Sequence, residues 1–200
     1  MEGHAAQDKA DMADHQTQTR YRLRCTVALV GMMGSGKTAI GRALAQRLDA
    51  AFLDSDAAIE EAAATSISEI FARDGEPFFR KREAEVIERL LSGPPAILST
   101  GGGAFLTPQV RDAVAARGIA LWLDADLDTL WDRVRHKDTR PLLRTADPRQ
   151  TLADIYAARV PVYALAGLRT AITPEASIEQ TTDRVMQTLI AAPGIVEPVA

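Results

Sequence analysis

The sequence predicts an α/β fold in which a five-stranded parallel sheet lies between two layers of helices. From Cys25 onward, short apolar runs rich in β-branched residues alternate with amphipathic stretches, a pattern typical of βαβ units with right-handed crossovers. The first apolar run also leads directly into a glycine-rich segment followed by a helical pattern. Ligands of such sheets bind at the carboxyl ends of the strands, so functional residues are expected there.

The apolar runs predict strands at Thr26–Val30, Ala51–Leu53, Ala96–Ser99, Ile119–Leu123 and Ala171–Thr173. The helical period predicts helices at Lys37–Leu48, Glu76–Leu91, Pro108–Arg117, Leu127–Arg135, Pro148–Leu165 and Ile178–Ala191, and suggests a short one at Ala57–Ala63. A proline close to the start of the Glu76–Leu91 segment marks the beginning of that helix.

The composition excludes several classes of protein. The chain has 200 residues, of which 46% are hydrophobic and 25% charged, as in an ordinary folded domain. Its net charge of −4 gives no basis for a general affinity for nucleic acid or anionic membranes. A single cysteine, Cys25, excludes a disulfide scaffold and cysteine-rich zinc or redox motifs, and it fits a reducing cytoplasm.

Histidine chemistry and membrane insertion are also poorly supported. The histidines are His4, His15 and His136, too few for a Ser-His-Asp or His-ligated metal site once the first two are assigned to a polar tail. No apolar run approaches the roughly 18 residues of a membrane span, and the N-terminus does not resemble a signal peptide. We therefore expect a cytoplasmic protein, a monomer, without nucleic-acid or membrane partners.

The domain organisation is simple. The stretch from Met1 to about Arg20 contains no Leu, Ile, Val or aromatic residue, so residues 1–20 are predicted to be a disordered tail. The internal Met12 leaves open a later translation start. Residues 21–200 are predicted to form a single domain, because no internal repeat or later linker is visible.

The glycine-rich segment Gly31–Thr38 reads G-x-x-x-x-G-K-T between a predicted strand and a predicted helix. This is the P-loop motif in its proper context, and it predicts a P-loop NTPase-type three-layer α/β/α sandwich. The backbone N–H groups of Gly34, Ser35 and Gly36 would surround phosphate oxygens. Lys37 would neutralise the β- and γ-phosphates, and the Thr38 hydroxyl would bind Mg²⁺.

Two carboxylates, Asp54 and Asp56, follow the second predicted strand, at the same sheet edge as the P-loop. One could approach the water ligands of a metal while the other accepts a hydroxyl proton. Either could instead cap the helix suggested at Ala57–Ala63. Capping and catalysis are compatible roles.

Two further segments follow. Arg80 and Glu83 are three residues apart on a predicted helix, so the carboxylate could orient the guanidinium for a planar anion, or the two could form an exposed ion pair of no functional consequence. Gly101, Gly102 and Gly103 follow the third predicted strand. They could form a simple turn or allow close approach of a ligand, and their place beside the P-loop favours a ligand.

A basic, proline-interrupted segment runs from Arg133 to Arg149 and includes Arg140. It could be solvated surface, or a lid at about residues 136–149 that closes over the phosphates and excludes water. Arg159, two residues before Pro161, lies near a kink or end of a later helix and could likewise be a surface residue.

Together these segments resemble the shikimate kinase family from Cys25 to about Ile190. That family carries a P-loop, Asp-x-Asp, Phe-Arg-x-x-Glu, three glycines, an Arg-Pro-Leu-Leu lid and a late Arg-x-Pro-x-Tyr. After the P-loop, the corresponding segments here are Asp54–Asp56, Phe79–Glu83, Gly101–Gly103, Arg140–Leu143 and Arg159–Tyr163.

The resemblance implies ATP-dependent phosphorylation of shikimate to shikimate 3-phosphate, with release of ADP, on the route to chorismate and aromatic amino acids. It implies that Asp56 binds ring hydroxyls and acts as general base. It also implies that Arg80 and Arg159 bind the substrate carboxylate and that Gly101–Gly103 approach the ring.

For the nucleotide and metal, the resemblance implies that Arg140 reaches the transferring phosphate and that Arg133 lies against the adenine. Asp54, through water, would complete a Mg²⁺ site with Thr38. One departure from the family is Ala39, where relatives often carry a second hydroxyl that contacts the α-phosphate. A second is that Ser99-Thr100 ends the third strand, where many other P-loop enzymes have an acidic residue.

Two alternatives remain at this point. Another small-metabolite P-loop kinase, acting on gluconate or a nucleoside monophosphate, would share the P-loop but not the combined arginine and triple-glycine set. A non-catalytic ATP-binding regulator would have no need of a general base, so the presence of Lys37, Thr38 and Asp56 argues against it.

Overall fold

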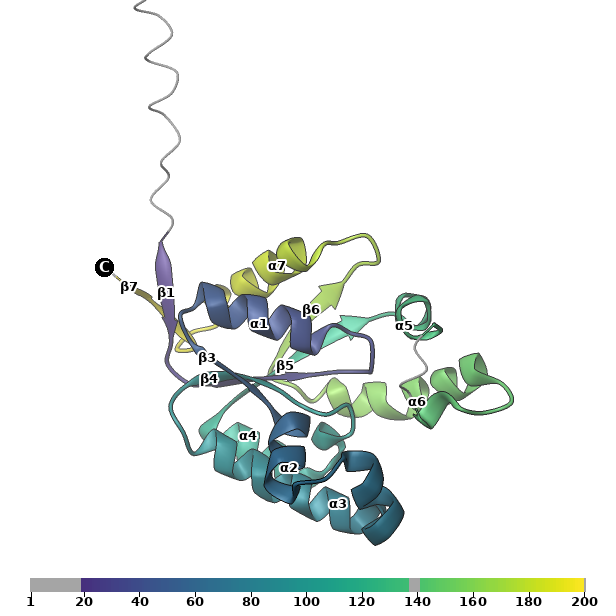
Figure 1. The fold of residues 1–200 in the computed structure, drawn as a ribbon. Coiled ribbons are helices and arrows are strands. Elements are labelled where there is room, and N and C mark those ends of the chain that lie inside the picture. Colours follow the sequence, from purple (N-terminus) through teal and green to yellow (C-terminus); the bar gives the residue numbers. More distant parts are fainter. Residues whose placement is uncertain (1–18, 137–140, 200) are drawn as a thin grey trace, which may run out of the picture.

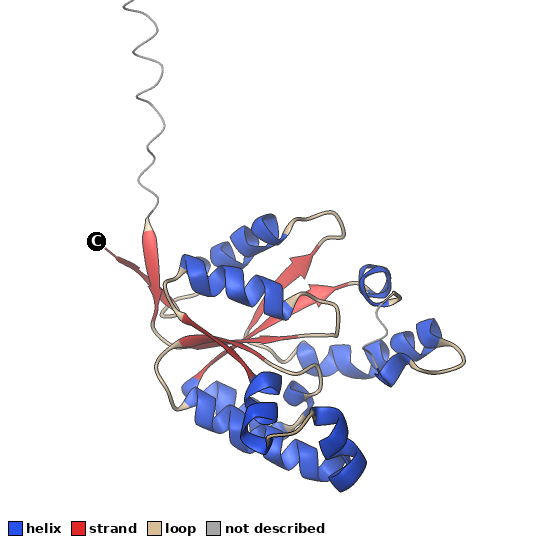
Figure 2. Ribbon diagram, in the orientation of Figure 1, coloured by secondary structure: helices blue, strands red, loops and turns tan. Residues whose placement is uncertain are grey.

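A central parallel sheet with the strand order β3-β4-β2-β5-β6 carries the functional loops. The computed structural model describes residues 19–136 and 141–199. The strands are β2 (Thr26–Val30), β3 (Ala51–Asp54), β4 (Ala96–Ser99), β5 (Gly118–Ala125) and β6 (Leu168–Ile172). Figures 1 and 2 show helices on both sides of this sheet, so the predicted three-layer fold is confirmed.

The helices divide between the two faces. On one face α1 (Lys37–Arg47) packs against α7 (Ile178–Ala191), and on the other α3 (Ile67–Leu91) packs against α4 (Pro108–Arg117) (Figure 1). The remaining helices are α2 (Ser55–Ala63), α5 (Leu127–Val134) and α6 (Pro148–Tyr163). Short 3₁₀ turns occur at Ala104–Leu106 and Pro141–Leu143.

The strand order brings separate loops to one edge. β2 lies between β4 and β5, and β4 pairs on its other side with β3. In this register Leu29 lies level with Ser99, and Ser99 lies level with Asp54. The P-loop, the Asp54–Asp56 segment and Gly101–Gly103 therefore leave the sheet next to one another. Below that edge, fully buried side chains such as Leu29, Leu98 and Leu121 form the core.

Two predicted elements differ from the structure by more than two residues at one end, and several others differ by one or two. α3 begins at Ile67 rather than at Glu76, and its two halves meet at Gly75, whose φ of 79° interrupts the helix. The predicted Glu76–Leu91 helix is therefore its second half. β6 spans Leu168–Ile172 rather than Ala171–Thr173, because it pairs with β5. The charged residue Arg169 interrupts the apolar pattern of this edge strand. In the structure its guanidinium forms an ion pair with Asp124 of β5.

A second, two-stranded sheet was not predicted. β1 (Arg20–Leu23) pairs antiparallel with β7 (Val196–Val199). Its strands have only four residues each, too few for a periodic pattern to identify them, and ion pairs from Arg22 and Arg24 to Glu197 support the pairing. Arg20, which was assigned to the predicted tail, is instead the first residue of β1. The rest of the predicted tail, residues 1–18, lies outside the described residues.

None of the helices in the described part of the chain combines the length and the apolar character needed to cross a membrane.

Candidate active site

The P-loop leaves the centre of the sheet at the end of β2 and enters α1. Gly34 and Gly36 have φ values of 83° and 96°, which residues with a Cβ rarely adopt. Gly36 is the N-cap of α1 and gives it no side-chain hydrogen bond. The first N–H groups of α1 are thus left for an anion, as in phosphate sites at helix N-termini.

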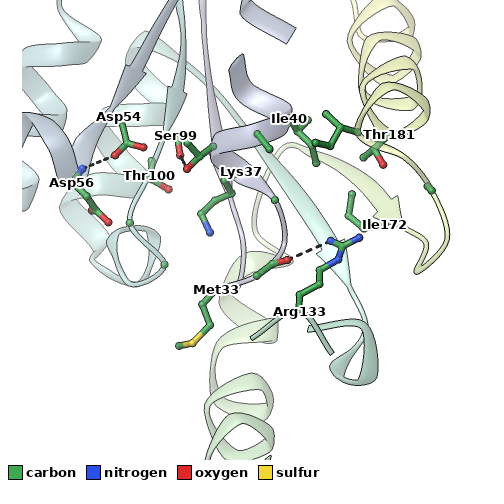
Figure 3. Close-up of a pocket in the computed structure, with 18 residues that line it drawn as sticks. Met33, Lys37, Ile40, Asp54, Asp56, Ser99, Thr100, Arg133, Ile172 and Thr181 are labelled. Carbon is green, nitrogen blue, oxygen red and sulfur yellow. Dashed lines mark hydrogen bonds between the residues drawn. The ribbon is translucent and has the colours of Figure 1, made fainter. Parts of the chain in front are cut away.

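Lys37 extends back across this loop. Its Nζ donates to the carbonyl oxygens of Gly31, at 2.8 Å, and Met32, at 3.0 Å. Figure 3 shows the ammonium group pointing into the space between Asp56 and Arg133. Unlike the Lys37 side chain, the Ser35 side chain is fully buried, and its hydroxyl has no hydrogen-bond partner in the part of the chain that the structure describes. Only the backbone of Ser35 is thus suited to bind phosphate.

Hydroxyl and carboxylate oxygens gather beside the P-loop. Thr38 Oγ1 lies 3.5 Å from Ser99 Oγ, and Thr38, Ser99 and Asp54 line the same cavity. These are ligand types that Mg²⁺ accepts, and Mg²⁺ commonly takes few protein ligands and keeps its waters and the nucleotide's phosphates. No group of three or more His, Cys, Asp or Glu side chains among residues 19–136 and 141–199 could hold a metal by itself. The donor set therefore fits a nucleotide-bound Mg²⁺.

The two carboxylates after β3 have different positions. Asp54 Oδ1 accepts hydrogen bonds from the backbone N–H groups of Asp56, at 3.1 Å, and Ala57, at 3.3 Å, which makes Asp54 the N-cap of α2. The capping alternative is therefore correct for Asp54, although this residue also lines the cavity. Asp56 lies in the first turn of α2 and lines the cavity too (Figure 3).

The surroundings of Asp56 disfavour its charge. Burial, and to a smaller extent the neighbouring Asp54 and Glu60, raises the pKa of its carboxyl group above the usual range, while Lys37 and Arg80 oppose that shift. A carboxylate whose proton affinity is raised is better suited to accept a proton than an exposed one. Asp56 therefore has the position and the electrostatic setting of a general base.

Arg80 is held in place by two carboxylates of α3. Its Nη1 donates to Glu83 Oε2 at 2.6 Å, and its Nε donates to Glu76 Oε1 at 3.2 Å. The Glu83 side chain is only 1% exposed and that of Arg80 23%, so the pair is not the exposed ion pair of the alternative interpretation. Burial opposes the charge of Arg80, but Glu83 and Glu76 raise the pKa of its guanidinium above the usual value.

The glycine loop, defined here as Gly101–Gly103, fits closely against these charged groups. A methyl group on Gly101 would lie 2.6 Å from Asp56 Oδ1, and one on Gly103 would lie 2.5 Å from Arg80 Nη2. Both distances are shorter than real contacts of a Cβ allow. The loop is therefore built of glycine because acidic and basic side chains of the site occupy the space beside it.

Arg159 reaches the same loop from α6. Its Nη1 donates to the Gly102 carbonyl oxygen at 3.3 Å, and the Tyr163 hydroxyl donates to that same oxygen. Arg159 is therefore engaged with the loop and is not a solvated surface residue. Arg80 and Arg159 contact neighbouring glycines of one loop, although they come from different helices.

The residues line one cavity of about 520 Å³ with two ends (Figure 3). One end of the cavity is lined by the carboxylates of Asp54 and Asp56 and by Gly101 and Gly102. Arg80, Gly103 and Arg159 lie next to this end. At the other end Arg133 Nη1 donates to the Gly34 carbonyl oxygen at 3.3 Å. Sequence reasoning missed the lining at this end, which comes from the apolar Ile172, Ala176 and Ile178 and from Thr181.

Two other outcomes concern single residues. Arg140 lies outside the described residues. Ser55 was missed, although its buried hydroxyl accepts from the Gly101 N–H at 3.0 Å and so links α2 to the glycine loop. A serine between two predicted site aspartates was the available signal.

Comparison with known proteins shows the family of this chain. The family model for shikimate kinase matches residues 33–190. The shikimate kinase of Ruegeria pomeroyi is 61% identical over 175 residues, 88% of this chain and 90% of that protein. That of Cereibacter sphaeroides is 54% identical over 180 residues, 90% of each chain.

A solved structure extends the similarity to three dimensions. The shikimate kinase from Acinetobacter baumannii in complex with shikimate superposes with a TM-score of 0.78 at 34% identity, covering 84% of this chain and 93% of that one. The sequence relatives, the family model and the solved structure thus each match most of the chain. The chain belongs to the shikimate kinase family.

Proposed function

We propose that this enzyme transfers the γ-phosphoryl group of ATP to a ring hydroxyl of shikimate, giving shikimate 3-phosphate and ADP in the synthesis of aromatic amino acids. The observation that carries the proposal is that Lys37 and Asp56 line one cavity, while Arg80 and Arg159 flank the glycine loop at its acceptor end. A phosphate donor and a small anionic alcohol can be held there together.

The nucleotide occupies the P-loop end. The N–H groups of Gly34, Ser35 and Gly36 and the N-terminus of α1 bind phosphate oxygens, and Lys37 exchanges its two carbonyl acceptors for the β- and γ-phosphates. Arg133 lies beside the nucleoside. Arg140, from the predicted lid at about residues 136–149, approaches the transferring phosphate.

Mg²⁺ fits the oxygen donors of Thr38 and, through water, Asp54. When bound, it supplies charge neutralisation at the β- and γ-phosphates. Since Asp54 Oδ1 caps α2, this residue also links the cation site to the start of the helix that carries Asp56.

Asp56 accepts the proton of the reacting hydroxyl. As the hydroxyl oxygen forms its bond to the γ-phosphorus, the bond from phosphorus to the β,γ-bridging oxygen breaks, the proton passes to the Asp56 carboxylate, and ADP leaves. Burial of Asp56, which raises its pKa, supports this role.

The acceptor's carboxylate binds to Arg80 and Arg159. Glu83 and Glu76 hold the Arg80 guanidinium in one orientation, so less conformational entropy is lost on binding. The glycine loop admits the ring beside both arginines.

We also propose that the protein is a monomer and that it lies in the cytoplasm. The single cysteine favours this reducing compartment.

The test is ADP release from the purified full chain with ATP and Mg²⁺, with shikimate, gluconate, AMP or no acceptor. Shikimate-dependent ADP release, with one equivalent of a new phosphate monoester detected by ³¹P NMR, is expected. Turnover with gluconate or AMP instead would identify another metabolite kinase. Tight ATP binding without turnover on any acceptor would identify a binding module.

A further inference from the structure

Tyr163 is a buried tyrosine behind the glycine loop. It lies at the end of α6 and is fully buried, and its ring stacks near Trp122 of β5 at a centroid distance of 6.4 Å. Its hydroxyl donates to the Gly102 carbonyl oxygen. A phenylalanine could fill the same volume, so packing alone does not explain the hydroxyl.

The Gly102 carbonyl oxygen has two donors from one helix. Arg159, one turn before Tyr163 on α6, donates its Nη1–H to the same oxygen at 3.3 Å. At the preceding residue, the Gly101 N–H donates to Ser55 Oγ at 3.0 Å, and the Gly101 carbonyl oxygen accepts from the Ala104 N–H at 3.1 Å. The middle of the glycine loop is therefore positioned from α6, and its first residue from α2 and the following turn.

Tyr163 also lies close to both proposed carboxylate-binding arginines. Burial raises the pKa of its hydroxyl, while the charges of Arg159 and Arg80 act in the opposite direction. Arg80 Nη2 is the atom nearest to the Cβ position of Gly103, the next residue of the loop. The Tyr163 hydroxyl thus holds the part of the loop whose displacement would change the distance between the two guanidinium groups.

We propose that Tyr163 is a positioning residue for the acceptor site: its hydroxyl, shared with Arg159 on the Gly102 carbonyl, sets the separation of the Arg80 and Arg159 guanidinium groups. Tyr163 acts through the glycine loop and Arg159. The inference rests on the proposed function, because the ligand whose binding it controls is the carboxylate of shikimate.

The test is Tyr163→Phe, which removes the hydroxyl and keeps the ring. We expect KM for shikimate to rise roughly tenfold, because the buried Gly102 carbonyl oxygen loses one of its two donors. KM for ATP and kcat should change less than about twofold. The dissociation constant of shikimate without nucleotide should rise by the same factor. Tyr156→Phe is the matched control, since Tyr156 lies on the same helix but close to Asp124, Asp126 and Arg169, and it should leave both KM values unchanged.

The outcomes separate the inference from the function on which it rests. If the wild-type protein neither binds nor phosphorylates shikimate, the proposed function is wrong. If the wild-type protein does both and Tyr163→Phe has the same KM for shikimate, the positioning role is wrong. ADP affinity and the thermal midpoint complete the test, because an equal loss of ADP and shikimate affinity would make Tyr163 a general structural residue and overturn the inference.

Discussion

The two ends of the cavity are built in different ways. The phosphate-binding part of the nucleotide end is one continuous segment, Gly31–Thr38, between β2 and α1, and it offers mostly backbone N–H groups. The acceptor end combines side chains from α2, α3 and α6 around the glycine loop, and its charged side chains are partly buried or, for Glu83, fully buried. Phosphate binding therefore depends on local backbone conformation, whereas the acceptor end depends on how distant segments pack.

The helix N-termini show the same difference. α1 begins at Gly36 without a side-chain cap, so its N–H groups are left for phosphate. α2 begins at Asp54, whose carboxylate occupies the equivalent N–H groups. Two helices that follow one another in the chain thus use the same backbone groups in different ways: α1 leaves them for a ligand, and α2 uses them to fix the position of Asp56.

The largest effect is expected for Asp56→Asn. It removes the proton acceptor while preserving the size of the side chain, so kcat should fall by about 10²- to 10⁴-fold. ADP affinity, measured by calorimetry, should stay close to that of the wild-type protein. Asp112→Asn, an exposed site on α4, is the control. Near-wild-type turnover of Asp56→Asn would remove this residue from the mechanism.

Arg80→Ala should raise KM for shikimate about a hundredfold with little change in KM for ATP, because a buried charge contact is lost at one end only. Arg82→Ala is the control, since the Arg82–Glu85 pair on the same helix is exposed and such pairs contribute little.

The Arg80 variant should also lose stability, since Glu83 is left buried without its partner. Adding Glu83→Gln should restore the thermal midpoint but not shikimate affinity. Equal losses for both ligands would contradict a specific acceptor role.

Gly103→Ala tests the close fit of the loop. The new methyl group would displace the Arg80 guanidinium, which is the flexible end of a side chain, so we expect little loss of stability. KM for shikimate should rise about ten- to a hundredfold, because small displacements of binding groups are costly. Gly93→Ala is the control, since its methyl group would contact only the Leu90 carbonyl oxygen, at 3.5 Å. An unchanged KM for shikimate would mean that shikimate binding does not depend on the present position of the Arg80 guanidinium.

Ala39→Ser tests whether the nucleotide end can be changed without affecting the acceptor end. Ala39 is exposed in the first turn of α1 and lines the cavity, so a hydroxyl there should add one contact to the nucleotide's phosphates. The affinity for ATP should increase about three- to tenfold, as measured by calorimetry, with KM for shikimate unchanged. Ala43→Ser, one turn further along α1, should have no such effect. A lower ATP affinity for Ala39→Ser would contradict the prediction.

The smallest effect concerns the cap of α3, the helix that carries Arg80. Ser66 and Glu69 form a capping box there, and hydrogen bonds from Ser66 and Thr65 lower the pKa of Glu69 from 4.5 to about 2. Because the folded-state pKa is the lower one, this stabilisation is complete above pH 4.5 and is lost as the pH falls toward 2.

The stability difference between wild type and Glu69→Gln, measured by urea unfolding at a series of pH values, should shrink over that interval. Ser66→Ala should lose the same pH-dependent contribution. A difference that does not vary with pH would show that the carboxylate does not stabilise the cap.

Local patterns predicted most of the fold. The helices Pro108–Arg117 and Ile178–Ala191 and the strands Thr26–Val30 and Ala96–Ser99 agree in their bounds with the structure. The β1–β7 pair and the first half of α3 were not predicted, and the first three residues of β6 were missed. The strands of the first pair have only four residues each, and the capping box of Ser66 and Glu69, which marks the start of α3, was overlooked. The conformation of β1 and β6 depends on partners distant in the sequence, such as Glu197 for Arg22 and Asp124 for Arg169.

By itself, the sequence determined the P-loop, its lysine and the order of the chemical motifs, because a phosphate-binding loop is encoded by the backbone preferences of adjacent residues. Only the tertiary structure decided that Glu83 is buried and that Tyr163 and Arg159 share the Gly102 carbonyl oxygen. The contacts of Gly102 join segments far apart in the chain, whereas the cap at Asp54 and the Arg80–Glu83 pair are local. These separate segments meet because the strand order brings the ends of β2, β3 and β4 to one edge of the sheet.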